Sequence, residues 1–131
     1  MPITYRIDND LGVVFRMFTG EITLDLLAEH YAELLADPEA EGMMTWVTDM
    51  RGCSLMVRGD EIRELVRKHI QPRMRGRRWE CAAIVETPVQ YGATNQFAVY
   101  SAECGHTQVF YDQHEAFAWA AGLIASAATP R

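Results

Sequence analysis

Apolar and polar residues alternate at the start of the chain in a way that is typical of β-strands. Residues 3–7 alternate, residues 8–12 bring the Asp, Asn and Gly of a turn, and residues 13–18 are mostly β-branched and aromatic. Together they predict an antiparallel hairpin. Three further strands are predicted at residues 44–50, 81–85 and 107–111. The 81–85 run is apolar throughout, as expected of a strand that is covered on both faces.

Four segments carry the features of helices, which are predicted at residues 24–36, 60–72, 88–102 and 113–125. The second has the clearest helical period, since its apolar stripe repeats at i, i+3, i+4, i+7 and i+8 and consists of Ile62, Leu65, Val66, His69 and Ile70. Thr23 is placed to cap the first helix, and Thr87 with Gln90 forms a capping box at the start of the third. Residues 112–115 form another box before the last helix.

The order of elements is β-β-α-β-α-β-α-β-α, and strands that alternate with helices predict an α/β domain with a largely parallel sheet. The length of 131 residues fits a single domain, 1–131, in which we expect the tail at 126–131 to fray. The apolar face of each element predicts a core. Its expected members are Ile84, Val85, Val47, Phe15, Leu27, Leu65, Val66, Ile70, Phe97, Val109 and Phe117.

Composition limits the kind of protein further. Hydrophobic residues make up 49% of the chain and charged residues 23%, which is typical of an ordinary globular domain. The net charge of −6 opposes general attraction to nucleic acids and to anionic membranes. No apolar run approaches a membrane span or a signal peptide, and Cys53, Cys81 and Cys104 form an odd, widely spaced set without a CxxC pair. We therefore expect a cytoplasmic protein with no nucleic-acid partner and no integral membrane contact.

A search for catalytic motifs finds none that is complete. The sequence contains neither GxGxxG nor GxxxxGK, so nucleotide binding through a glycine-rich loop is not expected. Ser54 lacks the second glycine of a GxSxG nucleophile elbow and has no evident His and acid partners. The histidines never pair at i+3 or i+4, so they predict no local metal site. We expect a protein that is not an enzyme and that uses no cofactor and no catalytic metal.

Asp49 is the most suggestive single carboxylate. It is predicted to end a central strand, where open α/β sheets place their ligands, and Arg51 follows in the same predicted turn. The alternative is an acid that anchors the loop after the strand by accepting hydrogen bonds from backbone N–H groups. The sequence leaves both interpretations open.

Basic residues are concentrated in one segment of an otherwise acidic chain. Residues 58–78 contain eight basic and three acidic residues, a local charge of +5, whereas the remainder carries −11. Arginine forks on this segment would suit an anion or an acidic partner. The alternative is a solvated helix face steadied by pairs such as Glu64 with Lys68. The candidate binding residues are Arg58, Arg73, Arg75, Arg77 and Arg78, of which the last four are expected to form an exposed positive patch.

The terminal helix carries no charge over residues 116–125. A helix that is apolar all round normally has more than one face covered, which predicts a homodimer. The expected interface residues are Phe117, Trp119 and Leu123. The alternative is that the alanines are tolerated in water and that Trp119 packs against its own chain.

Several short segments, taken in order, give most of the chain a resemblance to a known family. They read GVVF (12–15), FTGEIT (18–23), VTDMRG (47–52), CAAIV (81–85), VFYD (109–112) and EAFAW (115–119). The chain resembles the SpoIIAA-like group of the STAS superfamily, whose β-α superhelix is shared with the lipid-carrying CRAL-TRIO domains. The resemblance implies an α/β, STAS-like (SpoIIAA-like) β-α superhelix, in which an N-terminal hairpin precedes alternating helices and strands around a mixed, largely parallel sheet.

The sequence departs from this family at one functional motif. Anti-sigma-factor antagonists of the superfamily carry a DSSG-type motif whose serine is phosphorylated at the start of the second helix, whereas this chain reads VRGDE at 57–61. Partner switching by serine phosphorylation is therefore not expected. The resemblance implies a non-catalytic intracellular module for protein–protein interaction or regulation. The alternative is a binder of a small amphipathic or lipid-like anionic ligand, whose head the arginines would hold.

Overall fold

The computed structural model describes residues 1–128 and shows a five-stranded sheet with the strands in chain order. The strands are β1 (Ile3–Asp8), β2 (Val13–Ile22), β3 (Thr45–Leu55), β4 (Trp79–Ile84) and β5 (Gly105–Phe110). β1 and β2 pair antiparallel, and every other neighbouring pair is parallel. The predicted hairpin and the mixed, largely parallel sheet are thus confirmed. Gly12 has a φ of +71° in the hairpin turn, a conformation that glycine adopts without strain.

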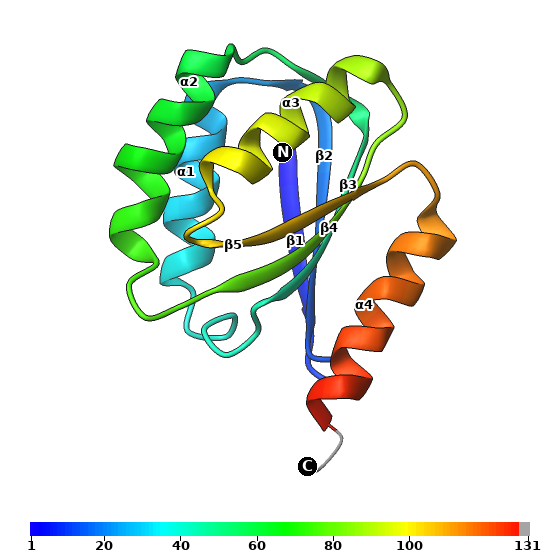
Figure 1. Cartoon of the computed structure of the whole chain (residues 1–131). Helices are drawn as coiled ribbons and strands as arrows, with labels where there is room; N and C mark the ends of the chain where they lie inside the picture. Colours follow the sequence, from blue (N-terminus) through cyan, green and yellow to red (C-terminus); the bar gives the residue numbers. More distant parts are fainter. Residues whose placement is uncertain (129–131) are drawn as a thin grey trace.

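Helices cover both faces of the sheet (Figure 1). α1 (Leu24–Ala36), α2 (Gly59–Glu64) and α3 (Pro88–Tyr100) lie on one face, and α4 (Gln113–Ala128) lies alone on the other. α2 continues into a π-helical turn, η1 (Leu65–Ile70), and a 3-10 turn, η2 (Gln71–Arg73), so the predicted helix at 60–72 is present as one continuous segment. No helix within residues 1–128 is both long and apolar enough to cross a bilayer.

The predicted caps are present at the helix starts. Oγ1 of Thr23 accepts a hydrogen bond from the backbone N–H of Leu26 at 3.3 Å, and Thr87 and Gln90 form the reciprocal capping box of α3. A carboxylate oxygen of Asp112 accepts from the first free N–H groups of α4. These side chains satisfy backbone donors that would otherwise be left without partners. The backbone of residues 126–128 continues α4, and the rest of the predicted tail, 129–131, lies outside the described residues.

β3 is longer than the sequence predicted. The prediction ended this strand at residue 50 because Asp49, Arg51 and Gly52 are typical of a turn, and that end is wrong. The strand continues to Leu55, since Cys53 and Leu55 pair with Gly20 and Ile22 of β2. Asp49 and Arg51 lie on the half-covered face of β3, which continues beyond them. Their polarity therefore reflects the exposure of that face and not the end of the strand.

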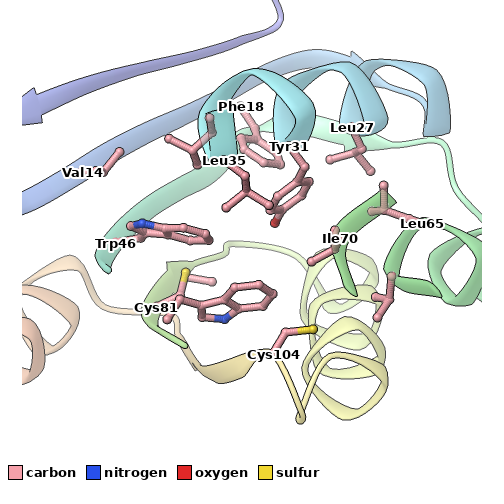
Figure 2. Close-up of a cluster of buried hydrophobic side chains, with 14 of the residues drawn as sticks. Val14, Phe18, Leu27, Tyr31, Leu35, Trp46, Leu65, Ile70, Cys81 and Cys104 are labelled. Atoms are coloured by element: carbon pink, nitrogen blue, oxygen red, sulfur yellow. The ribbon is translucent and has the colours of Figure 1, made fainter. Parts of the chain in front are cut away.

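The larger core lies between the sheet and the face formed by α1, η1 and α3 (Figure 2). Its centre is aromatic: Trp46 and Trp79 stack with ring centroids 5.1 Å apart, and Phe97 stacks on Trp79 at 6.0 Å. Figure 2 shows Tyr31 and Leu35 of α1 pointing toward this stack, with Ile70 and Leu65 beside it. Rings in such offset stacks stabilise a core beyond the area that they bury.

The smaller core lies beneath α4, where Ala116 and Ala120 pack on Val47 and Ile84 of the sheet. The core prediction is confirmed for Ile84, Val85, Val47, Leu27, Leu65, Val66 and Ile70, whereas Phe15, Phe97 and Val109 are half-buried. The prediction for Phe117 is wrong, because this side chain is 37% exposed. α4 turns its small alanines to the sheet, which brings its backbone close and leaves Phe117 on the flank.

Candidate functional site

Arg16 is buried in the centre of the domain. Along β2 the side chains alternate between the two faces, so Arg16 shares the inner face with Val14 and Phe18 and cannot turn to solvent without shifting the strand. Only 5% of the residue is exposed. The sequence carried a signal for this position, since Arg16 follows Val14 and precedes Phe18 at the period of the buried face. The sequence interpretation did not use that signal and missed the residue.

Four side chains from three other elements surround the Arg16 guanidinium. Nε donates to Oγ1 of Thr48 on β3 at 2.8 Å, and Nη2 donates to Sγ of Cys81 on β4 at 3.7 Å. Nη1 lies 3.1 Å from the hydroxyl of Tyr31 and 3.2 Å from Nε2 of His30, both on α1. The guanidinium carbon also lies 4.8 Å from the ring centre of Trp46. The group is therefore held by neutral acceptors and aromatic faces.

No carboxylate within residues 1–128 forms an ion pair with Arg16. Burial and the guanidinium together lower the pKa of His30 from 6.5 to about 3, so the imidazole is neutral at physiological pH. A buried charge without a counter-charge is costly, and proteins normally pair it. Arg16 thus leaves a place for a negative charge inside the domain.

An apolar cavity of about 60 Å³ adjoins this group. It lies between the sheet and the helices α1 to α3, and its lining includes Arg16 and three of its hydrogen-bond partners, Tyr31, Thr48 and Cys81. The rest of its lining is mainly aliphatic and aromatic, including Leu27, Met50, Leu55, Ile62, Leu65 and Phe97. A buried cation at one end of an apolar cavity is the arrangement that would suit an anionic head and an apolar body.

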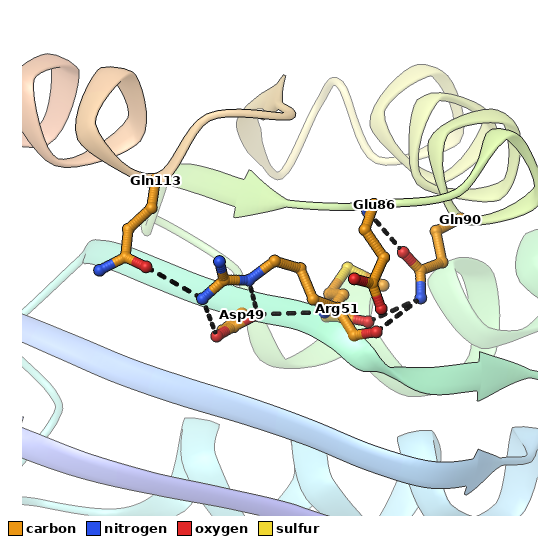
Figure 3. A network of polar contacts seen from close by, with 6 residues as sticks. Asp49, Arg51, Glu86, Gln90 and Gln113 are labelled. Atoms are coloured by element: carbon orange, nitrogen blue, oxygen red, sulfur yellow. Dashed lines mark hydrogen bonds and ion pairs between the residues drawn. The ribbon is translucent and has the colours of Figure 1, made fainter.

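Asp49 and Arg51 lie on the opposite face of the sheet, beside the start of α4 (Figure 3). Nε and Nη2 of Arg51 donate to the two carboxylate oxygens of Asp49 at 3.0 and 2.8 Å, and Nη2 also donates to Gln113 at 3.0 Å. The Arg51 side chain lowers the pKa of Asp49. Asp49 also accepts from the backbone N–H of Arg51, as the anchoring interpretation expected, although the anchored segment is a strand.

A shallow groove of about 510 Å³ adjoins this pair. Its floor is the part of β1, β2 and β3 that α4 leaves uncovered, and Phe117 forms one wall. Met17 on the floor is 51% exposed. The structure therefore brings together Asp49, Arg51 and Phe117, which the sequence proposed for separate roles.

The predicted arginine cluster does not lie in the groove with Asp49, Arg51 and Phe117. Arg58 lies at the start of α2, paired with Asp60, whereas Arg73, Arg75 and Arg78 are exposed around η2 and the loop before β4. Arg77 is half-buried: Nη1 donates to the carbonyl of Leu35 at 2.9 Å, and its buried Nε has no partner. Of the four arginines predicted to form an exposed patch, three are exposed and Arg77 is not, and their contacts do not build a binding site.

The sequence also missed the second role of Gln90. Its Nε2 donates to the carbonyls of Met50 and Cys53 at 2.9 and 2.8 Å. β3 runs past the end of β4, since their pairing stops at Asp49 and Ile84, and the carbonyls beyond that point need other donors. The buried Gln90 amide supplies them, which ties the start of α3 to the extended end of β3.

Two solved structures share this architecture along most of their length. One is an uncharacterized protein of the DUF3478 family with a SpoIIAA-like fold from Shewanella loihica PV-4. It is 19% identical with a TM-score of 0.57, and the match covers 89% of this chain and 92% of that chain. The other is an anti-sigma factor antagonist from Mycobacterium paratuberculosis, 13% identical with a TM-score of 0.54, matched over 90% of this chain and 93% of that one.

These similarities show that the chain has a SpoIIAA-like fold, as the sequence resemblance predicted. The sequence itself matches no protein-family model and no curated protein. Within residues 1–128, no three His, Cys, Asp or Glu side chains are grouped in a way that could hold a metal ion. The candidate chemistry of the domain therefore rests on Arg16 and its cavity.

Proposed function

We propose that this domain is a non-catalytic binding module whose interior cavity takes a small carboxylate with a short apolar body. The observation that carries the proposal is the buried Arg16 guanidinium, which meets an apolar cavity and has no carboxylate partner within residues 1–128. A ligand carboxylate would supply the missing negative charge, and its apolar body would lie against Leu27, Leu65 and Phe97. This is the second of the two functions that the sequence suggested, with a different arginine.

The cavity volume sets the size of the ligand. An engineered cavity of about 150 Å³ holds a benzene ring, so a cavity of this kind with about 60 Å³ holds only a few non-hydrogen atoms. A short carboxylate therefore fits the structure better than a long lipid chain. A longer chain would require the Ile62 and Leu65 side chains of the helix above the cavity to move apart from the sheet.

Thermal unfolding with a series of carboxylates tests the proposal. Acetate, butyrate, hexanoate and octanoate are compared at constant ionic strength with the neutral amide of the same length. A ligand at ten times its Kd stabilises the native state by about 1.4 kcal/mol, which raises Tm by about 5 °C in a domain of this size. We expect this rise for a short carboxylate and not for its amide, and the chain length at which it ends measures the usable cavity.

Two arginine variants test whether the rise in melting temperature with carboxylate depends on Arg16. Arg16→Met keeps a stem of similar shape and removes the charge, so it should abolish the response to carboxylate. The variant removes a buried charge but also takes the donor away from Thr48 and Tyr31, so its response is compared with its own melting temperature without ligand. Arg51→Met is the matched control outside the cavity and should respond like the wild type. Equal responses to carboxylate and amide in the wild type, or a full response in Arg16→Met, would overturn the proposal.

We propose protein contact as a second function, with a second copy of this chain as the occupant of the groove beside α4. The groove lies next to a helix that has no charged residue over residues 116–125, and Met17 and Phe117 expose apolar surface there. A second copy would bring its own uncharged helix to this groove through the same patch, as a two-fold dimer requires. The SpoIIAA-like fold, which an anti-sigma factor antagonist shares, supports a regulatory role for either kind of binding.

A further inference from the structure

Cys81 contacts the Arg16 guanidinium and, like Arg16, lines the interior cavity. Its Sγ accepts a hydrogen bond from Nη2 of Arg16 at 3.7 Å and lies 3.6 Å from Oγ1 of Thr48. Nε of Arg16 donates to the same Thr48 oxygen at 2.8 Å, which fixes the three groups relative to one another. Cys81 also lines the cavity, together with Arg16 and Thr48. A thiol, a hydroxyl and a cation thus converge at one point of the interior.

The other two cysteines are each near a carboxylate, and within residues 1–128 neither has a buried guanidinium beside it. Burial raises the pKa of Cys53 to about 11, and the carboxylates of Asp49 and Glu86 act in the same direction. Burial and Glu103 likewise raise the pKa of Cys104. Both thiols therefore stay protonated and weakly nucleophilic at neutral pH. The reactivity of Cys81 can therefore be compared with that of two other thiols in the same chain.

The Arg16 guanidinium has one N–H group that could donate a hydrogen bond to an oxidised form of Cys81. Nη2 donates only to Cys81, so one of its two N–H groups has no acceptor within residues 1–128. An oxygen atom added to the sulfur on the cavity side would be anionic or polar, and it would have a buried cation beside it. The cavity of about 60 Å³ admits a molecule the size of hydrogen peroxide, which is little larger than water.

We propose that Cys81 is a modification site, at which hydrogen peroxide oxidises the thiol to a sulfenic acid that Arg16 and Thr48 stabilise. The sulfur attacks one peroxide oxygen, an S–O bond forms and the O–O bond breaks. The sulfur loses two electrons and the peroxide gains them. The second peroxide oxygen leaves as hydroxide and takes the thiol proton to become water, so thiol and peroxide give sulfenic acid and water.

The test oxidises the folded protein and identifies the modified cysteine. Reduced protein is exposed to a small molar excess of hydrogen peroxide, the reaction is stopped with catalase, and the chain is then unfolded in urea that contains dimedone. Unfolding before trapping is needed because dimedone is too large for the cavity, whereas peroxide is not. Mass spectrometry of the digested chain should place dimedone on Cys81, with Cys53 and Cys104 largely unmodified.

Variants then test whether the oxidation of Cys81 depends on Arg16 and Thr48 or only on the access of peroxide to the thiol. A Cys53→Ser, Cys104→Ser chain keeps Cys81 alone and should gain one dimedone, whereas Cys81→Ala should gain almost none. Arg16→Met should slow the oxidation of Cys81 by at least roughly tenfold, the effect of losing one hydrogen bond to a charged group. Thr48→Val removes the hydroxyl with little change of shape and should slow it to a smaller extent.

Two results would overturn the proposal. One is oxidation of Cys53 or Cys104 ahead of Cys81 in the folded protein. The other is oxidation of Cys81 only when urea is present during the peroxide step. If Arg16→Met does not fold, the order of oxidation among the three cysteines of the wild type still decides. The experiment uses no carboxylate ligand, so it can fail while the proposed ligand binding holds, and the reverse is equally possible.

Discussion

Nη1 of Arg16 lies 3.2 Å from Nε2 of His30 in the interior of the domain. A guanidinium carries donors only, so Nε2 accepts the hydrogen bond and the proton of the neutral ring is on Nδ1. Protonating His30 would place a second cation beside the first in a buried site. Burial and Arg16 accordingly lower the pKa of His30 to about 3.

This pair predicts that acid destabilises the domain through His30. The pKa of His30 is near 6.5 in the unfolded chain and about 3 in the folded one, so the unfolded state binds the proton first. The stabilisation is complete above pH 6.5 and is lost as the pH falls toward 3, by about 1.4 kcal/mol for each pH unit. Urea unfolding at pH values from 8 to about 5.5, above the range in which most carboxylates titrate, measures this slope.

His30→Gln is the matched variant, because its amide oxygen can still accept from Arg16 and it does not titrate. Its free energy of unfolding should vary much less over the same pH range. A variant slope equal to that of the wild type would show that His30 is not the group responsible.

Gln90→Leu should lower the free energy of unfolding more than Thr87→Ala, which removes only the other side chain of the capping box. Gln90→Leu leaves the carbonyls of Met50 and Cys53 without a donor at the buried end of β3. Unsatisfied buried polar groups cost about 1 to 3 kcal/mol each, so a loss of roughly 2 to 6 kcal/mol is expected for the two carbonyls. Thr87→Ala removes the capping side chain alone and should cost about 1 kcal/mol. Chemical denaturation of both variants gives the comparison, and equal losses would argue against the strand-end role of Gln90.

Gly105 should not tolerate even a methyl group. A Cβ there would lie 2.5 Å from the Cγ and Cδ1 atoms of Trp79, whose ring is fully buried in the aromatic stack. We expect Gly105→Ala to lower the free energy of unfolding by about 1 to 3 kcal/mol or more, because the stack must shift. Gly122→Ala is the control: nothing lies within 4 Å of its added Cβ, and alanine should stabilise α4 by up to about 1 kcal/mol. Melting curves that rank the two variants the other way would contradict this packing.

The fold could be predicted from the sequence because its signals are local. The helical period at Ile62, Leu65 and Val66 and the caps at Thr23 and Thr87 each depend on neighbours along the chain. The end of β3 could not be predicted in the same way. Whether Asp49 and Arg51 end a strand or line its open face depends on β2, which pairs with the strand beyond them.

The interior site was hidden for a related reason. Arginine is rarely buried, so a sequence interpretation directs attention to exposed clusters such as Arg73 to Arg78. The alternation along β2 could have placed Arg16 on the buried face, but its four partners from β3, β4 and α1 are not shown by the chain order. Asp49 and Arg51 are close in the sequence and were singled out together. Which face of the sheet they lie on depends on the register of β3 with its neighbours, which the sequence does not show.

Two substitutions on α4 should separate self-association from folding. Trp119 packs on its own chain, with its ring centre 5.9 Å from that of Phe110 and 5.6 Å from that of His106, so Trp119→Glu should lower the melting temperature. Phe117 is 37% exposed beside the groove, although its ring packs edge-on against Phe15 with the ring centres 6.1 Å apart. Phe117→Glu should therefore lower the melting temperature of the monomer less than Trp119→Glu does, and it should abolish a dimer that buries Phe117. Sedimentation at micromolar concentration should give twice 14.9 kDa for the wild type and a monomer for Phe117→Glu. A wild-type mass of 14.9 kDa would reject the dimer, whereas a dimer that persists in Phe117→Glu would place the contact elsewhere.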